Sequence, residues 1–196
     1  MSRSREAHRL LCGLVAAIAI AASATEASFA AAPAKARYGF GKPASAQEIA
    51  GWDIDVRPDG KGLPPGRGSV EQGQAIYDQK CASCHGTFGE SNDYMALAGG
   101  VGTLGSDQPI RTTGSKLNHA TTLWDYINRA MPFDKPGMLT ASEVYATAAF
   151  VLNLNGIIPD DAVMNASSLP KVRMPNRDGF VPDARPDVGP GTGDKR

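Results

Sequence analysis

The pattern that most constrains this chain is a pair of cysteines three residues apart with a histidine directly after the second, Cys81-Ala82-Ser83-Cys84-His85. This C-x-x-C-H arrangement is typical of covalent c-type haem attachment. Two thiols at this spacing, on a chain that turns helically, match the two vinyl groups of a haem. The adjacent imidazole then lies beneath the iron as an axial ligand. The motif therefore predicts haem c bound through Cys81 and Cys84 and ligated by His85.

Two other kinds of site use a C-x-x-C pair. A thioredoxin-like redox pair follows a strand in a βαβ unit, whereas a helical pattern precedes Cys81. A structural zinc site needs two further Cys or His ligands, and after residue 30 only His119 remains outside the motif. Both alternatives are weaker than the haem interpretation. The motif occurs once in the chain, so a single haem is expected.

The N-terminus has the pattern of an export signal. Arg3, Arg5 and Arg9 come first, an apolar run follows from Leu10, and small residues end at Ala30. This order is typical of a secretory signal peptide. The apolar run, of about a dozen residues, is too short for a membrane span, which needs about 20. We expect cleavage after Ala30, with Ala24 and Ala27 as alternative sites. Removal of residues 1–30 leaves a periplasmic protein without a membrane span.

The charge of the exported chain excludes some classes of partner. Removing residues 1–30 lowers Lys+Arg from 20 to 17, because three arginines are lost, and lowers Asp+Glu from 20 to 18, because Glu6 and Glu26 are lost. The difference, 17 minus 18, gives a net charge of −1. A near-neutral chain does not favour nucleic acid or an anionic membrane as a partner.

Three helices are predicted in the central part of the chain. The first covers residues 69–81, where Ser69 and Gln72 fit a capping box. The second is capped by Thr121 or Thr122 and stopped by Pro132. The third begins at Thr140, with a second capping box, and ends at 155–156. With a possible short helix over 46–52, the predicted fold is all-α, with about three to five helices around one haem.

The composition divides the chain into four parts. Residues 1–30 are the signal peptide and residues 31–68 form an extended N-terminal flank rich in Ala, Pro and Gly. Residues 69–156 are predicted to be the haem domain. Residues 157–196 form a proline-rich C-terminal extension, because proline at this frequency excludes a long helix.

The second axial ligand of the iron is predicted to be a methionine, since electron-transfer haems commonly use a His/Met pair. Met131 is the first choice because Pro132 ends the preceding helix and presents it from a turn. Met174 is the rival if the C-terminal extension wraps back, and His119 would give a bis-His haem instead. Arg111, Trp124 and Arg129 are candidates for bonding the haem propionates. They fit equally well as solvated arginines and a core tryptophan.

The order of helix, C-x-x-C-H, long loop, helix, Met-Pro turn and amphipathic helix over residues 69–156 resembles class I cytochromes c. The resemblance implies that the first and last helices cross where a glycine meets an aromatic ring, here Gly73 and Tyr77 against Phe150. The family often has a proline soon after the haem histidine, whose carbonyl orients the imidazole. Here Gly86 and Thr87 follow His85, so that acceptor is not assigned from the sequence.

A narrower resemblance covers most of the exported chain. It rests on residues 52–58, 80–86, 123–132 and 174–177. These segments are similar to the cytochrome subunits of bacterial sulfite and sulfane dehydrogenases of the Sox sulfur-oxidation system. The resemblance implies a hetero-oligomer, in which a molybdopterin subunit like sulfite oxidase oxidises the sulfur compound. This chain would accept single electrons and pass them to other redox partner proteins.

Three other functions remain open at this point. The first is a general electron carrier to a terminal oxidase. The second is a small haem enzyme, such as a peroxidase or a thiosulfate-oxidising cytochrome, which needs an open iron site and distal acid–base groups. The third is a gas-binding sensor. Because His119 is the one further histidine after residue 30, we expect the chain not to be catalytic by itself.

Overall fold

The computed structural model describes residues 40–91 and 94–182. The chain divides into two units, one ending at Ser45 and one beginning at Ala46. Residues 40–45 of the first unit contain no helix or strand. The expected signal peptide, residues 1–30, lies outside the described residues, as does the end of the C-terminal extension.

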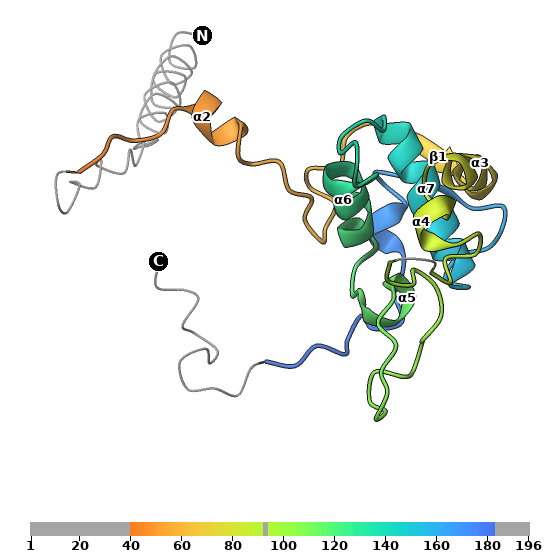
Figure 1. Cartoon of the computed structure of the whole chain (residues 1–196). Helices are drawn as coiled ribbons and strands as arrows, with labels where there is room; N and C mark the ends of the chain where they lie inside the picture. The colour runs from red at the N-terminus through yellow and green to blue at the C-terminus, as the bar shows by residue number, and fades with distance from the viewer. Residues whose placement is uncertain (1–39, 92–93, 183–196) are drawn as a thin grey trace, which may run out of the picture. The chain divides into compact units, whose positions relative to one another are not determined.

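The second unit is mostly helical, as predicted (Figure 1). Among the described residues, the helices and strands in chain order are α2 (Ala46–Ala50), β1 (Arg67–Ser69), α3 (Val70–Lys80), α4 (Ala82–His85), α5 (Thr113–Lys116), α6 (Ala120–Ala130), α7 (Ala141–Leu154), β2 (Val163–Asn165) and the 3-10 helix η1 (Leu169–Lys171). None of the described helices is long and apolar enough to cross a membrane.

The helix termini follow mostly from local side-chain chemistry. Ser69 and Gln72 form the predicted capping box of α3, and Thr140 and Glu143 form that of α7. The predicted start of α6 at Thr121 or Thr122 is wrong: the helix begins at Ala120, and His119 is its N-cap without a side-chain hydrogen bond. Within the first turn Thr121 is buried and Thr122 is exposed, so the helix starts early enough to pack Thr121 into the core instead of using it as a cap.

The close crossing of α3 and α7 organises the core. A Cβ atom added at Gly73 would overlap the carbonyl oxygen of Ala146 and would lie 2.8 Å from Cβ of Phe150. The rings of Tyr77 and Phe150 pack with centroids 5.1 Å apart. The predicted glycine–aromatic crossing is confirmed, because only a residue without a side chain lets the two backbones approach this closely. α6 also packs on α7, with the rings of Trp124 and Tyr145 5.3 Å apart.

The segments that flank the central helices contribute to the same core. β1 pairs with β2 in an antiparallel ladder, with Gly68 opposite Met164. Met164, Leu169 and Met174 are 6%, 0% and 1% exposed. Before β1, the hydroxyl of Tyr145 donates a 2.9 Å hydrogen bond to the carbonyl of Pro64. The chain on both sides of the central helices is thus held against α7.

Candidate functional site

The C-x-x-C-H motif forms one helical turn at the end of α3. Cys81 is the C-cap of α3, and its N–H donates to the carbonyl of Tyr77 at 2.8 Å. The N–H groups of Cys84 and His85 donate back to the carbonyl of Cys81 at 3.1 and 3.0 Å. Both thiols are free, and no disulfide joins them. The two thiols and the imidazole therefore project from one turn of a helix, as covalent haem attachment requires.

The two thiols lie in different surroundings. Cys84 is exposed, whereas Cys81 is partly buried. Burial raises the pKa of the Cys81 thiol to about 11, although the neighbouring positive charge of Lys80 acts in the opposite direction. A thiol with this pKa is protonated at neutral pH, so Cys81 is a poor nucleophile or metal ligand by itself.

The imidazole of His85 has a backbone acceptor at one ring nitrogen. Nδ1 of His85 lies 3.4 Å from the carbonyl oxygen of Met95, which is a long contact. A protonated Nδ1 that faces a carbonyl leaves Nε2 as the lone-pair nitrogen available to a metal. This acceptor is not recognisable in the sequence, because it lies ten residues further along a glycine-rich loop and no residue type marks it.

The loop after His85 is fixed by Gly86. Gly86 has φ 80° and ψ 159°, a backbone conformation almost restricted to glycine. Its carbonyl accepts a 2.9 Å hydrogen bond from the buried hydroxyl of Tyr77. Burial is the main reason why the pKa of Tyr77 is raised, so this hydroxyl stays protonated and remains a donor. The α3 residue that packs against Phe150 thereby also holds the chain beside His85.

The two candidate methionines differ in their environment. Met131 is the C-cap of α6, where its N–H donates to the carbonyl of Ile127 at 3.1 Å, and it is partly buried. Met174 is 1% exposed and belongs to the hydrophobic core cluster.

His119, the other candidate ligand, is engaged by the C-terminal extension, because Nη1 of Arg177 lies 2.9 Å from its Nδ1. Burial and the charge of Arg177 lower the pKa of His119, which keeps the ring neutral as an acceptor.

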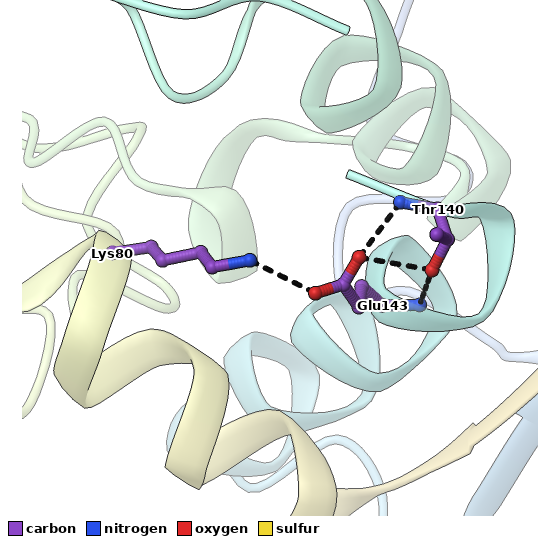
Figure 2. Close-up of polar contacts among 3 residues, drawn as sticks. All are labelled: Lys80, Thr140 and Glu143. Atoms are coloured by element: carbon purple, nitrogen blue, oxygen red, sulfur yellow. Dashed lines mark hydrogen bonds and ion pairs between the residues drawn. The ribbon is translucent and has the colours of Figure 1, made fainter. Parts of the chain in front are cut away.

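An ion pair joins the motif end of α3 to the start of α7 (Figure 2). Nζ of Lys80 lies 2.8 Å from Oε1 of Glu143, while Oε2 of Glu143 accepts hydrogen bonds from Thr140 N at 2.8 Å and Thr140 Oγ1 at 2.9 Å. Lys80 and Thr140 together hold the pKa of Glu143 at about 2. The capping box is recognisable in the sequence but its link to Lys80 is not, because Lys80 and Glu143 are 63 positions apart.

Comparisons with known proteins agree with this geometry. The family model described as cytochrome c oxidase, cbb3-type, subunit III matches residues 68–151. A search of curated proteins finds no match. Among solved structures, one chain of the sulfane dehydrogenase SoxCD from Paracoccus pantotrophus is 42% identical, with a TM-score of 0.69 over 75% of this chain and 73% of that chain.

The chain belongs to the cytochrome c family. It is an electron-transfer cytochrome with the class I fold, and its family implies a haem c cofactor. The predicted resemblance to a sulfane dehydrogenase chain is likewise confirmed.

Two features of this cytochrome fit a haem. The first is an unpaired buried donor: Nε1 of Trp124 has no hydrogen-bond partner among the described residues. A buried N–H group without an acceptor is costly, and a haem propionate would supply one. Of the other two propionate candidates, Arg111 is exposed and Arg129 is paired with Asp125.

The second feature is a set of exposed apolar side chains between the motif and α7. Phe88, Met95, Val101, Ile110, Phe133 and Met138 are all between 47% and 79% exposed. Of these residues, Met95 lies at the motif, since its carbonyl oxygen is 3.4 Å from Nδ1 of His85, and exposed apolar side chains beside a site fit a ligand that covers them. A porphyrin attached to Cys81 and Cys84 would provide such apolar surface within the same part of the chain.

Proposed function

We propose that this cytochrome binds one haem c through thioether bonds to Cys81 and Cys84, with Nε2 of His85 as the proximal ligand of the iron. The supporting observation is the single helical turn that carries both thiols and the imidazole, together with the backbone carbonyl of Met95 beside Nδ1. Bound there, the haem would supply one-electron chemistry. The protein residues orient the imidazole through Met95 and fix the adjoining loop through Tyr77 and Gly86.

Met131 is the proposed second axial ligand, in preference to Met174. Met131 ends α6 and is only partly buried, so its thioether can turn toward an iron. Met174 is packed among core residues, and withdrawing it would leave a cavity. The assignment also agrees with the Met-Pro turn in the class I pattern.

The haem assignment is tested by spectroscopy and mass analysis of the exported protein. The expected mass is that of the processed chain plus one haem, and single alanine substitutions at Cys81 and Cys84 should each leave one thioether bond. Met131→Leu should abolish the weak near-infrared sulfur-to-iron band of the ferric protein. Met174→Leu, the matched control, should retain it. A protein without added haem would overturn the proposal, and a band lost only in Met174→Leu would overturn the Met131 assignment.

We further propose that this cytochrome is the periplasmic, single-haem subunit of a molybdenum-containing dehydrogenase for sulfite or a related sulfur compound. The observation that carries this proposal is the 42% identity to a chain of a sulfane dehydrogenase, over three quarters of this chain. In this role the cytochrome accepts single electrons from the molybdenum subunit and passes them to further redox proteins. Residues 1–30 would direct export and be removed.

This role is tested by mixing the ferric cytochrome with a sulfite oxidase-like molybdenum subunit from the same organism. Addition of sulfite or a sulfane compound should reduce the haem, with one electron taken up per cytochrome. The same reaction without the molybdenum subunit is the control and should leave the haem ferric. Failure of reduction in the complete mixture would contradict the proposed donor.

A general electron carrier to a terminal oxidase is the second candidate. It is favoured by the family model that matches residues 68–151, because that model is described by a subunit of a cytochrome oxidase. The two roles differ in partner specificity. Rapid oxidation of the ferrous cytochrome by a cbb3-type oxidase, with no faster reduction by a molybdenum subunit than by unrelated donors, would favour the carrier.

A further inference from the structure

The segment that leads into the haem domain places a group of apolar side chains in solvent. All residues from 46 to 55, here called the N-terminal arm, are exposed. Ile49, Trp52 and Ile54 are 53%, 87% and 56% exposed. Large apolar side chains at this density on an exposed segment mark a surface that is covered by a partner.

The N-terminal arm has a defined local structure. Its helix α2 continues into a turn in which the N–H groups of Trp52 and Asp53 both donate to the carbonyl of Ile49 at 2.9 Å. These hydrogen bonds hold Ile49 and Trp52 close together at the end of α2. A binding segment that is already folded loses less conformational entropy when it docks.

The chain that follows the N-terminal arm is fixed to the haem domain. Val56 and Leu63 pack against the core cluster, and a Cβ atom on Gly60 would lie 2.5 Å from Cγ of Pro170. The carbonyl of Pro64 accepts the hydrogen bond from Tyr145. A partner that held the arm would therefore be tied to the core that carries the C-x-x-C-H motif.

The comparison with the sulfane dehydrogenase extends into this part of the chain. The match covers 75% of 196 residues, or about 147 residues, whereas only 129 residues lie from position 68 to the C-terminus. At least about 18 matched residues, 147 minus 129, therefore precede residue 68. The family model for the haem domain begins at residue 68. The segment before β1 is thus shared with a dehydrogenase chain, although it lies outside the general cytochrome domain.

The charge of the N-terminal arm favours a different protein over a second copy of this chain as its binding partner. The arm contains Glu48, Asp53 and Asp55 and has no lysine or arginine. Two such arms facing each other would bring like charges together, which disfavours self-association. A partner surface with an apolar groove and basic residues at its rim would complement the arm.

We propose that the N-terminal arm is the docking element for the catalytic subunit of the dehydrogenase, with Ile49, Trp52 and Ile54 inserted into an apolar groove that basic side chains border. This inference rests on the proposed function, since it names how that complex is held together. Trp52 is the central contact, because tryptophan is enriched among the residues that dominate interfaces.

The test uses the exported, haem-loaded full chain and the sulfite oxidase-like molybdenum subunit from the same organism. Affinity is measured by calorimetry for the wild type, for Trp52→Ser and for the triple variant Ile49→Ser/Trp52→Ser/Ile54→Ser. The triple variant should bind about 30-fold more weakly or worse, while Trp52→Phe should restore most of the affinity lost in Trp52→Ser. The matched control is Phe180→Ser/Val181→Ser, because these side chains are also 59% and 84% exposed.

The outcomes separate this inference from the proposed function. If the wild type binds and the triple variant binds equally well, the docking element is overturned while the proposed partner stands. Equal weakening in the control would also overturn the assignment to the N-terminal arm. If the wild type shows no binding, both are overturned. A wild type that sediments as a dimer, with a monomeric triple variant, would assign the arm to a second copy of the chain and contradict our proposal.

Discussion

At the scale of single residues, the hydroxyl of Tyr77 joins the core to the loop beside His85. It donates to the carbonyl of Gly86 at 2.9 Å and is buried, so its removal leaves a buried acceptor without a partner. Tyr77→Phe is expected to lower the free energy of unfolding of the haem protein by about 1–3 kcal/mol. Denaturant unfolding followed by circular dichroism measures this change. Tyr126→Phe is the control, because Tyr126 is 59% exposed; an equal loss there would contradict the explanation.

The candidate haem-binding side chains were the part of the site that could be predicted best from the sequence. Cys81, Cys84 and His85 are recognisable because their spacing along the chain is itself the chemical requirement. The carbonyl of Met95 beside His85 was not recognisable, since every residue has a carbonyl and only the loop conformation brings this one to Nδ1. Side-chain motifs can be read from a sequence, whereas backbone acceptors depend on the fold.

At the scale of helices, the crossing of α3 and α7 depends on the missing side chain of Gly73. Gly73→Ala would push a methyl group into the carbonyl of Ala146, which is main chain and cannot rotate away. We expect a loss of at least about 3 kcal/mol in unfolding free energy, or no accumulation of haem protein. Gly105→Ala is the matched control, because a Cβ atom there meets nothing within 4 Å. The yield and the thermal unfolding of the two variants are compared. Equal stability of Gly73→Ala and Gly105→Ala would contradict the requirement for a glycine at the crossing of α3 and α7.

The Lys80–Glu143 pair is expected to make stability depend on pH. The pKa of Glu143 falls from 4.5 to about 2 in the folded protein. Its stabilising effect is therefore fully present above pH 4.5 and is lost as the pH falls toward 2. Because the Glu143 side chain is 30% exposed, we expect Glu143→Gln to cost about 1–2 kcal/mol at pH 7. The difference from wild type should shrink steadily below pH 4.5.

Urea unfolding of both proteins between pH 7 and pH 2.5 measures this difference. Glu71→Gln is the control, since Glu71 is exposed in the first turn of α3 and is not part of that ion pair. A cost for Glu143→Gln that stayed constant across this range would rule out the charged pair as its source.

At the scale of the whole molecule, the flanking segments were the least predictable part of the fold. Both capping boxes could be identified because they are local patterns of four residues. The β1–β2 ladder joins residues almost a hundred positions apart, such as Gly68 and Met164, and neither strand has a periodicity of its own. Likewise, the sequence left Met174 as the rival ligand on the condition that the extension after α7 wraps back, and only the structure shows that this return buries its side chain in the core.

The C-terminal extension returns to the core at Met174. Met174 is 1% exposed within the core cluster, so Met174→Ala should open a cavity and cost about 2–4 kcal/mol in unfolding free energy. The visible and near-infrared spectra should be unchanged, since the proposed axial ligand is Met131. Met138→Ala, at a side chain that is 47% exposed, should cost less than about 0.5 kcal/mol. A stable Met174→Ala variant that loses its sulfur-to-iron band would reverse the two roles, whereas an unstable variant with the band intact shows that the extension is part of the haem domain's core.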